Sequence, residues 1–468
     1  MNKEFVRPLL LIIVTIVIIG IIASIIPACD KGAVPIKKMH WFDSLSRLGK
    51  PQVKATELAT RDTVRFDSDL SPLDQFRKEL NGYQKRPKGS IRIAYYGDSI
   101  IEGDLITGML RQSFQTNYGG SGIGFMPITS IVSGFRHTIK HSFSKNWEAV
   151  SFMTSGKPNL ALGISGFVFI PRNYYVVEKS IEPTLDTLGV DTTAVATETK
   201  AQKSNKKYYV NTASWVKYQA SDIPGGCAQF DRIRLFYSNA KDSSYVNCSL
   251  DGQTAQRYSL RSGTGVQELD LSGANPAKTV YLEFNPLDPV HVYGVSLDQN
   301  SGLFVDSFTI RGYSGMYFER IPQHILSGFQ QALDYDLVIL HYGENVSNPK
   351  IRDYGFYKRG MMKTIAHIRS AMPGVPLLLV SAHDRSLKIA GEYQTSPDIP
   401  SLINSQAETA READCGFWNL FEVMGGLNSM VTYVKHSPPW ASPDYTHFNR
   451  TGADHIGSLL YKVITDKQ

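Results

Sequence analysis

The sequence of 468 residues contains only four cysteines, and none of them lies in a Cys-x-x-Cys pair. It also lacks the cysteine and histidine spacing of a zinc site, and it has no arginine-rich stripe. The net charge of +6 and the isoelectric point near 8.8 are mild for a chain of this length. These absences argue against thiol redox catalysis, a zinc site and a nucleic-acid partner.

Two of the cysteines leave alternatives open. Cys227 and Cys248 are candidates for a disulfide if the chain is exported, because disulfides persist in oxidising compartments. Buried free thiols are equally compatible with the sequence.

The first 29 residues predict where the protein resides. An apolar run from Leu9 to Ala28 follows Lys3 and Arg7 and contains no charge, and it has about the 20 residues that a membrane span needs. Because positive charge stays on the cytoplasmic side, we expect the remainder outside the cytoplasm, in the periplasm or at the cell surface. The segment is either an uncleaved signal anchor, which its length favours, or a signal peptide cleaved before a lipidated Cys29. Either alternative attaches the protein to a membrane.

The next stretch leads from a tether to a strand and a sharp turn. Residues 30–70 are polar without a sustained period, which is typical of a tether. A helix is expected over Pro72–Tyr83 with Ser71 as its cap, followed by an apolar strand over Ile91–Tyr96.

Ser99 occupies a position that suits a nucleophile. It closes the turn Gly97-Asp98-Ser99 after the strand, and apolar residues from Ile101 to Phe114 then recur at helical spacing. Free backbone N–H groups at such a helix start favour a developing negative charge. The alternative is an ordinary turn with a helix cap.

The middle of the chain changes character. From about residue 146 to residue 302, short alternating runs and turn residues replace helical periodicity, and Asp251-Gly252 marks a hairpin. We therefore expect an inserted β-sandwich over 146–302. Aromatic residues within it that could stack on sugars or simply pack its core are Trp147, Tyr208, Tyr209, Trp215 and Tyr218.

After residue 302 strands and helices alternate again, which predicts a parallel sheet covered on both faces. Strands are expected at 304–311, 336–342, 377–381 and 416–420, and helices at 323–333, 354–371, 402–413 and 452–463. A site would form at the carboxyl ends of these strands.

Three polar stretches lie where such a site would form. They are Gly312-Tyr313-Ser314-Gly315, Gly343-Glu344-Asn345 and Asp444-Tyr445-Thr446-His447. A serine hydrolase needs a base, a carboxylate that orients the base, and donors aimed at the oxyanion. His447, Asp444, the Gly315 N–H and the Asn345 amide can fill these roles around Ser99. Further polar residues that could tune the pocket, most of which we expect to be structural, are His341, Glu344, His383, Asp384 and His436.

The order of these stretches resembles the SGNH, or GDSL-type, hydrolases. Gly97-Asp98-Ser99 matches the first family block, Arg311–Gly315 resembles the second, Gly343-Glu344-Asn345 the third, and Asp444–Asn449 the last. The resemblance implies Ser99 as nucleophile, His447 as base and Asp444 as its partner, with an oxyanion hole of Ser99, Gly315 and Asn345. The third block departs from the usual family pattern G-x-N-D, because Val346 follows the asparagine.

A narrower likeness covers more of the chain. Gly103-Asp104 and the glycine-rich segment Gly119–Phe125 are similar to bacterial peptidoglycan O-acetylesterases. In those enzymes a carbohydrate-binding-module-like β-sandwich interrupts the hydrolase domain between its first two blocks. The insert here falls in the same interval, so the hydrolase domain is expected over 71–145 and 303–468.

The sequence thus predicts an α/β protein: a three-layer SGNH-type hydrolase with a central parallel sheet, an inserted β-sandwich and an N-terminal transmembrane or signal helix. The expected activity is removal of O-acetyl groups from a cell-wall or other extracytoplasmic glycan, without a metal or organic cofactor. Alternatives are an O-acetyltransferase with the same triad and a non-catalytic glycan-binding surface protein.

Overall fold

The computed structural model describes residues 67–87, 89–154, 160–179 and 204–466. The predicted membrane segment and nearly all of the predicted tether lie outside these residues. Within them, no helix is both long enough and apolar enough to cross a bilayer.

A five-stranded parallel sheet forms the centre of the α/β part, with the strand order β15-β1-β16-β17-β20. Its strands are β1 (Ser90–Gly97), β15 (Gly302–Thr309), β16 (Leu337–His341), β17 (Leu377–Val380) and β20 (Gly416–Trp418). They are almost continuously buried, as expected for a parallel sheet that is covered on both faces. The predicted parallel sheet is confirmed.

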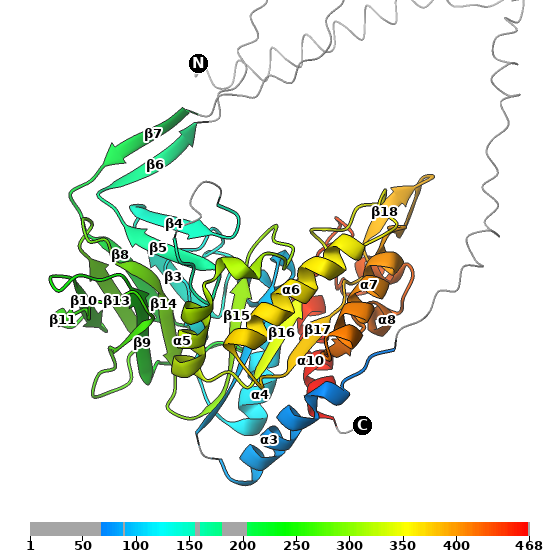
Figure 1. The fold of residues 1–468 in the computed structure, drawn as a ribbon, viewed down its shortest axis with the longest axis horizontal. Helices are drawn as coiled ribbons and strands as arrows, with labels where there is room; N and C mark the ends of the chain where they lie inside the picture. The colour runs from blue at the N-terminus through cyan, green and yellow to red at the C-terminus, as the bar shows by residue number, and fades with distance from the viewer. Residues whose placement is uncertain (1–66, 88, 155–159, 180–203, 467–468) are drawn as a thin grey trace, which may run out of the picture. The chain divides into compact units, whose positions relative to one another are not determined.

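Helices cover both faces of this sheet (Figure 1). The helices are α3 (Asp74–Lys85), α4 (Thr107–Tyr118), α5 (Gln323–Leu333), α6 (Gly355–Ala371), α7 (Ile399–Glu412), α8 (Leu420–Met424), α9 (Ser429–Lys435) and α10 (Arg450–Thr465). Because side chains alternate along a strand, Ile93 and Tyr95 of β1 pack in the core with α4 and α10, while Ala94 and Tyr96 pack in the core with α5, α6 and α7. This arrangement gives three layers.

Single helix boundaries largely follow the hydrophobic periodicity. The helix at 323–333 is observed as predicted, and the other three helices predicted after residue 302 shift by at most three residues at an end. The predicted cap at Ser71 is wrong, because α3 has no side-chain cap and the Ser71 hydroxyl donates to Asp69 instead, at 2.7 Å.

Two antiparallel sheets pack around a shared apolar core beside the parallel sheet. One has the strand order β11-β10-β13-β8-β3, and the other has β12-β9-β14-β5-β4 with β2 paired to β14. Their strands are β2 (Gly124–Met126), β3 (Ile139–Phe143), β4 (Trp147–Ser151), β5 (Phe167–Pro171), β8 (Ser214–Ala220), β9 (Arg232–Ser238), β10 (Tyr245–Leu250), β11 (Gln256–Ser259), β12 (Gln267–Asp270), β13 (Thr279–Phe284) and β14 (His291–Asp298).

The predicted hairpin at Asp251-Gly252 is confirmed between β10 and β11, where both residues have positive φ. Strands β2 and β3 join the antiparallel sheets although they precede residue 146, and the division into domains stays a prediction. Two hairpins stand outside the larger sheets: β6 (Tyr174–Lys179) with β7 (Ser204–Tyr209), and β18 (Ser386–Ile389) with β19 (Glu392–Thr395).

Three cysteines in the described residues are buried free thiols: Cys227, Cys248 and Cys415. The free-thiol alternative for Cys227 and Cys248 is therefore the one that the structure supports. Burial raises the pKa of both thiols to about 12, so neither is a reactive thiolate at neutral pH.

A buried ion cluster joins the parallel sheet to an antiparallel one. The guanidinium of Arg92 on β1 contacts the carboxylates of Asp306 on β15 at 2.7 Å and Asp298 on β14 at 2.5 Å. The Tyr335 hydroxyl donates a hydrogen bond to Asp306. The backbone N–H of Phe125 donates a second one, at 2.8 Å. Since these groups are almost fully buried, each charge depends on its partner.

Candidate active site

Ser99 lies directly beyond the carboxyl end of β1, where the chain turns sharply. At Gly97 a Cβ would meet the Ile101 side chain at 2.9 Å and the His341 carbonyl at 3.2 Å, so the turn has room only for glycine. The Asp98 carboxylate accepts the N–H of Ile100 at 3.1 Å, which fixes the start of the 3₁₀ helix η2 (Ser99–Asp104).

The long helix expected after this turn is interrupted, which corrects the sequence prediction. Gly103 and Asp104 at the end of η2, and Ile106 just before α4, all have positive φ. Two of them are not glycine, so the kink needs support from outside. Arg111 and Arg136 supply it by contacting the buried Asp104 at 3.2 and 2.8 Å. Burial alone would raise the pKa of Asp104, but these two arginines lower it below its usual value.

The structure brings together Ser99, His447 and Asp444, as their sequence contexts predict. Ser99 Oγ lies 3.2 Å from His447 Nε2, and His447 Nδ1 lies 2.8 Å from Asp444 Oδ2. A carboxylate can only accept, so Nδ1 carries the ring proton and Nε2 is left to accept the serine hydroxyl. This is the order of donors and acceptors that a serine nucleophile requires.

Asp444 also shapes the turn that carries the histidine. Its Oδ1 accepts the backbone N–H groups of Thr446 at 2.9 Å and His447 at 3.0 Å. Partial burial would raise the pKa of Asp444, but these bonds and the imidazole lower it overall, so the carboxylate stays charged at neutral pH.

An open cleft of about 550 Å³ surrounds this arrangement, within the roughly 300–1,000 Å³ typical of small-molecule sites. The cleft is lined by Ser99, Glu102, Leu105, Phe135, Arg311, Gly312, Asn345, Ser442, Asp444, His447 and Phe448. Four of the five predicted site residues therefore share one cleft, and Gly315 is outside its lining.

Asn345 follows β16 and reaches the cleft, but its amide already has partners. Nδ2 donates to Asp98 Oδ2 at 2.8 Å and to the Tyr313 carbonyl at 3.1 Å. An amide nitrogen has two hydrogens, so donation to an oxyanion requires the exchange of one of these bonds. Its predicted role stays a prediction.

Gly315 has a structural reason to be glycine. Its φ is +86°, and a Cβ there would lie 2.6 Å from the Tyr342 ring. Its carbonyl accepts the Thr364 hydroxyl at 2.9 Å, which fixes this segment against α6. The close approach to Tyr342 accounts for the glycine, and the predicted oxyanion role stays a prediction.

Comparison with known proteins identifies the architecture. A solved structure of a peptidoglycan O-acetylesterase matches 84% of this chain and 95% of its own, at 20% identity and a TM-score of 0.62. The chain has the fold of an SGNH hydrolase. At this identity the likeness shows the SGNH fold alone. No family model and no curated protein sequence matches the chain.

Two further solved structures match the chain with lower TM-scores. A carbohydrate esterase family 2 enzyme with a carbohydrate binding domain from Corynascus thermopiles shows 13% identity and a TM-score of 0.25, over 54% of this chain and 93% of its own. A GDSL-like lipase from Parabacteroides merdae shows 15% identity and a TM-score of 0.27, over 35% of this chain and 73% of its own. Their TM-scores are too low to support any conclusion.

One ion pair in the cleft of this SGNH fold was not singled out from the sequence. Arg311 Nε donates to Glu102 Oε1 at 3.2 Å, and a second guanidinium nitrogen pairs with Oε2. The Glu102 side chain is almost buried while Arg311 is more than half exposed, so one edge of the guanidinium faces the cleft. The position of Arg311 just beyond a strand end was the available signal.

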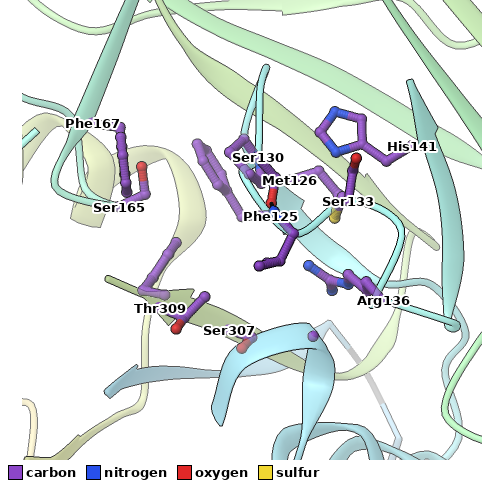
Figure 2. Close-up of a pocket in the computed structure, with 14 residues that line it drawn as sticks. Phe125, Met126, Ser130, Ser133, Arg136, His141, Ser165, Phe167, Ser307 and Thr309 are labelled. Carbon is purple, nitrogen blue, oxygen red and sulfur yellow. Dashed lines mark hydrogen bonds between the residues drawn. The ribbon is translucent and has the colours of Figure 1, made fainter. Parts of the chain in front are cut away.

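A second and smaller cavity of about 50 Å³ lies between β15 and the antiparallel strands (Figure 2). Figure 2 shows hydroxyls, a guanidinium, an imidazole and aromatic rings around it. Its imidazole, His141, bonds the Ile128 carbonyl at 3.0 Å, and burial lowers the pKa of His141 to about 4. A space of this size can hold only a few water molecules. Because no predicted catalytic side chain lines it, the cavity lies outside the candidate active site.

Proposed function

We propose that this protein is a serine-dependent carbohydrate O-acetylesterase that acts through an acyl-enzyme. The observation that carries the proposal is the continuous chain of hydrogen-bonded groups from Asp444 through His447 to Ser99, at the wall of an open cleft. The SGNH fold supports it, because this fold places the serine at the carboxyl ends of the strands.

The geometry suits two chemical steps. Ser99 Oγ attacks the acetyl carbonyl while His447 Nε2 takes its proton, and the same proton then passes to the departing sugar hydroxyl. Asp444 holds the imidazole in the tautomer that can accept and stabilises the imidazolium. Water, activated by the same imidazole, then attacks the acyl-serine and releases acetate. The residues of the cleft supply a nucleophile, a base and its partner without a metal or organic cofactor.

The substrate is proposed to be an O-acetylated glycan outside the cytoplasm. The solved structure with the similar fold is a peptidoglycan O-acetylesterase, so cell-wall glycan is the first polymer to test. Attachment to a membrane is part of the proposal, and it depends on the apolar run at 9–28, which lies outside the described residues. Acetylated xylan and sialylated glycans are the comparison substrates.

Acetate release from these substrates tests the function, and two variants test the residues. Ser99→Ala and the double variant with His447→Ala should lose similar activity, on the order of 10³-fold or more, because the two side chains act as one unit. Ser370→Ala, on the exposed end of α6, is the control. Near-normal turnover by Ser99→Ala would contradict the assignment, and transfer of acetyl to a sugar acceptor without acetate release would favour a transferase.

A further inference from the structure

A second imidazole and carboxylate lie behind the turn that carries His447. His383 Nδ1 is 3.3 Å from Glu344 Oε1, and the exposed fractions of the two side chains are 0% and 8%. Among the described residues, neither carboxylate oxygen of Glu344 nor Nδ1 of His383 has any hydrogen-bond partner. Buried polar atoms are rarely left unpaired, so a proton between these two groups is expected.

The other ring nitrogen of His383 determines where that proton can come from. Nε2 lies 2.7 Å from the backbone carbonyl oxygen of Thr446, which can only accept, so Nε2 must carry a hydrogen. In a neutral ring Nδ1 then has only a lone pair, and Glu344 must donate. Burial favours this state because it lowers the pKa of His383 to about 4 and raises that of Glu344 to about 8.

We propose that Glu344 and His383 form a positioning relay, in which protonated Glu344 fixes the His383 tautomer whose Nε2–H holds the Thr446 carbonyl. Thr446 lies between Asp444 and His447, so the relay fixes the turn that carries both candidate catalytic groups. Phe448 packs on the His383 ring with centroids 4.9 Å apart, which holds the ring in place. The inference rests on the proposed function, since it supposes that His447 is the base.

The relay also joins two parts of the site. Glu344 is the residue before Asn345, which follows β16, whereas the Thr446 turn precedes α10. Through His383 the segment of the candidate oxyanion donor and the turn of the base are held by one chain of contacts. Neither residue touches the reacting atoms, so both act by position.

Loss of the Glu344 proton would break the relay. The new carboxylate accepts a hydrogen bond, so the single ring proton of His383 moves from Nε2 to Nδ1 while the Glu344 proton leaves to solvent. Nε2 then presents a lone pair to the Thr446 carbonyl, and that hydrogen bond is lost. The turn loosens, so kcat should fall as the pH rises through the pKa of Glu344.

Other charged groups around the pair modify this titration. The titratable or charged groups that act on Glu344 and His383 from the surrounding elements are His447, Arg385, Asp384, Asp398, Asp98 and His341. Arg385 favours the charged form of Glu344 and the neighbouring carboxylates oppose it, while burial has the largest effect. The protonated form at neutral pH is the net result.

Glu344→Gln and Glu344→Ala separate a relay from simple packing. The glutamine amide can donate to Nδ1 and does not titrate. We expect Glu344→Gln to keep kcat within about threefold of wild type at pH 7, and to lose the alkaline fall near pH 8. Glu344→Ala should lose about 10- to 100-fold in kcat with little change in KM, because the turn is misplaced. Glu408→Gln, at the surface pair with Lys358, is the control and should keep the wild-type profile.

A readout that needs no activity distinguishes this proposal from the proposed function. In ¹⁵N-labelled Ser99→Ala protein, His383 should be protonated at Nε2 near pH 6.5 and at Nδ1 above the Glu344 transition, and Glu344→Gln should abolish the change. An unprotonated Nε2 at pH 6.5, or an alkaline limb that Glu344→Gln leaves unchanged, would overturn the relay. If the wild type releases no acetate from any ester while the tautomer change occurs, the proposed function fails and the relay stands.

Discussion

At the level of single residues, the Asn345 amide has two protein partners that compete with a developing oxyanion. Asp98 and the Tyr313 carbonyl accept its two hydrogens. If one bond is exchanged in the transition state, Asn345→Ala should lower kcat by about 10²–10³ with little effect on folding. Steady-state kinetics on a small acetyl ester measures this. A change in KM alone would assign Asn345 to substrate binding instead.

Asp98 predicts a dependence of stability on pH. Burial is the main cause that raises the pKa of Asp98 to about 7, although the bonds from Ile100 and Asn345 oppose it. The folded state then binds more protons than the unfolded state between about pH 4 and pH 7, so this carboxyl lowers stability as the pH rises. Between pH 4 and pH 8 this carboxyl should lower the unfolding free energy of the wild type by at most about 4 kcal/mol. Asp98→Asn should not show this fall.

Urea unfolding at several pH values checks this slope, with Asp336→Asn as the matched control. Burial also raises the pKa of Asp336 to about 7, but this residue precedes β16 at the opposite end from the site. Asp336→Asn should flatten the pH dependence of the unfolding free energy as Asp98→Asn does, while leaving turnover unchanged. A wild-type slope in Asp98→Asn would mean that its carboxyl titrates normally.

The sequence predicts a site residue best when the pattern that reveals it is local, and worst when its partners lie far away along the chain. Ser99 and His447 could be found because each lies in a short stretch next to a strand or helix end. The pairing of Glu344 with His383 joins residues 39 positions apart through burial, which no local pattern encodes. Likewise, the sequence placed Asn345 in the site. It gave no sign that the Asp98 carboxylate competes with an oxyanion for the Asn345 amide.

At the level of elements, the hairpin β18–β19 holds the turn of the base from the outside. Tyr393 of β19 stacks face to face on Tyr445, with ring centroids 3.6 Å apart and planes within 8°. Tyr445 has a positive φ, and its carbonyl accepts the N–H of Ser386 at 3.0 Å. The hairpin therefore stabilises a backbone conformation that tyrosine rarely adopts.

Removal of this stack should loosen the turn. We expect Tyr393→Ala to lower kcat about tenfold, since an aromatic pair contributes about 0.5–1.5 kcal/mol beyond its buried area. Tyr393→Phe should restore the activity because the ring suffices. Gln394→Ala, at the next and exposed position of β19, is the control. If Tyr393→Phe were as impaired as Tyr393→Ala, the hydroxyl rather than the stack would be responsible.

Helices and strands could be predicted where apolar periodicity determines their bounds. They could not be predicted where contacts of buried polar groups determine them. The helix at 323–333 has a regular apolar stripe and was predicted correctly. The predicted helix after Ser99 has a similar stripe, but it breaks at Gly103, where the buried Asp104 pairs with Arg111 of α4 and with Arg136, which lies beyond the predicted helix. The hairpin β18–β19 was missed because its residues are mostly exposed and carry little periodicity.

At the scale of the whole molecule, the aromatic rings of the antiparallel sheets differ in whether a ligand could reach them. Tyr218 is fully buried and donates to the Pro127 carbonyl at 2.8 Å, so it cannot stack on a sugar as its sequence context allowed. Trp147 bonds the Trp215 carbonyl at 3.1 Å and packs on Phe284. Tyr218 thus belongs to the interior and Trp147 is partly buried against it, whereas Tyr209 is 71% exposed and available to a ligand.

The Arg92 cluster predicts that the two parts lose stability together. Asp298→Asn removes one carboxylate from a buried guanidinium on β1, and breaking such a pair costs about 3–5 kcal/mol. Because Arg92 belongs to the parallel sheet and Asp298 to an antiparallel one, amide hydrogen exchange should show a similar loss of protection in β9 and in β16. Asp242→Asn, on an exposed turn, is the control. A loss confined to the antiparallel sheets would mean that residues 146–302 unfold as a separate domain, as the sequence predicts for an insert.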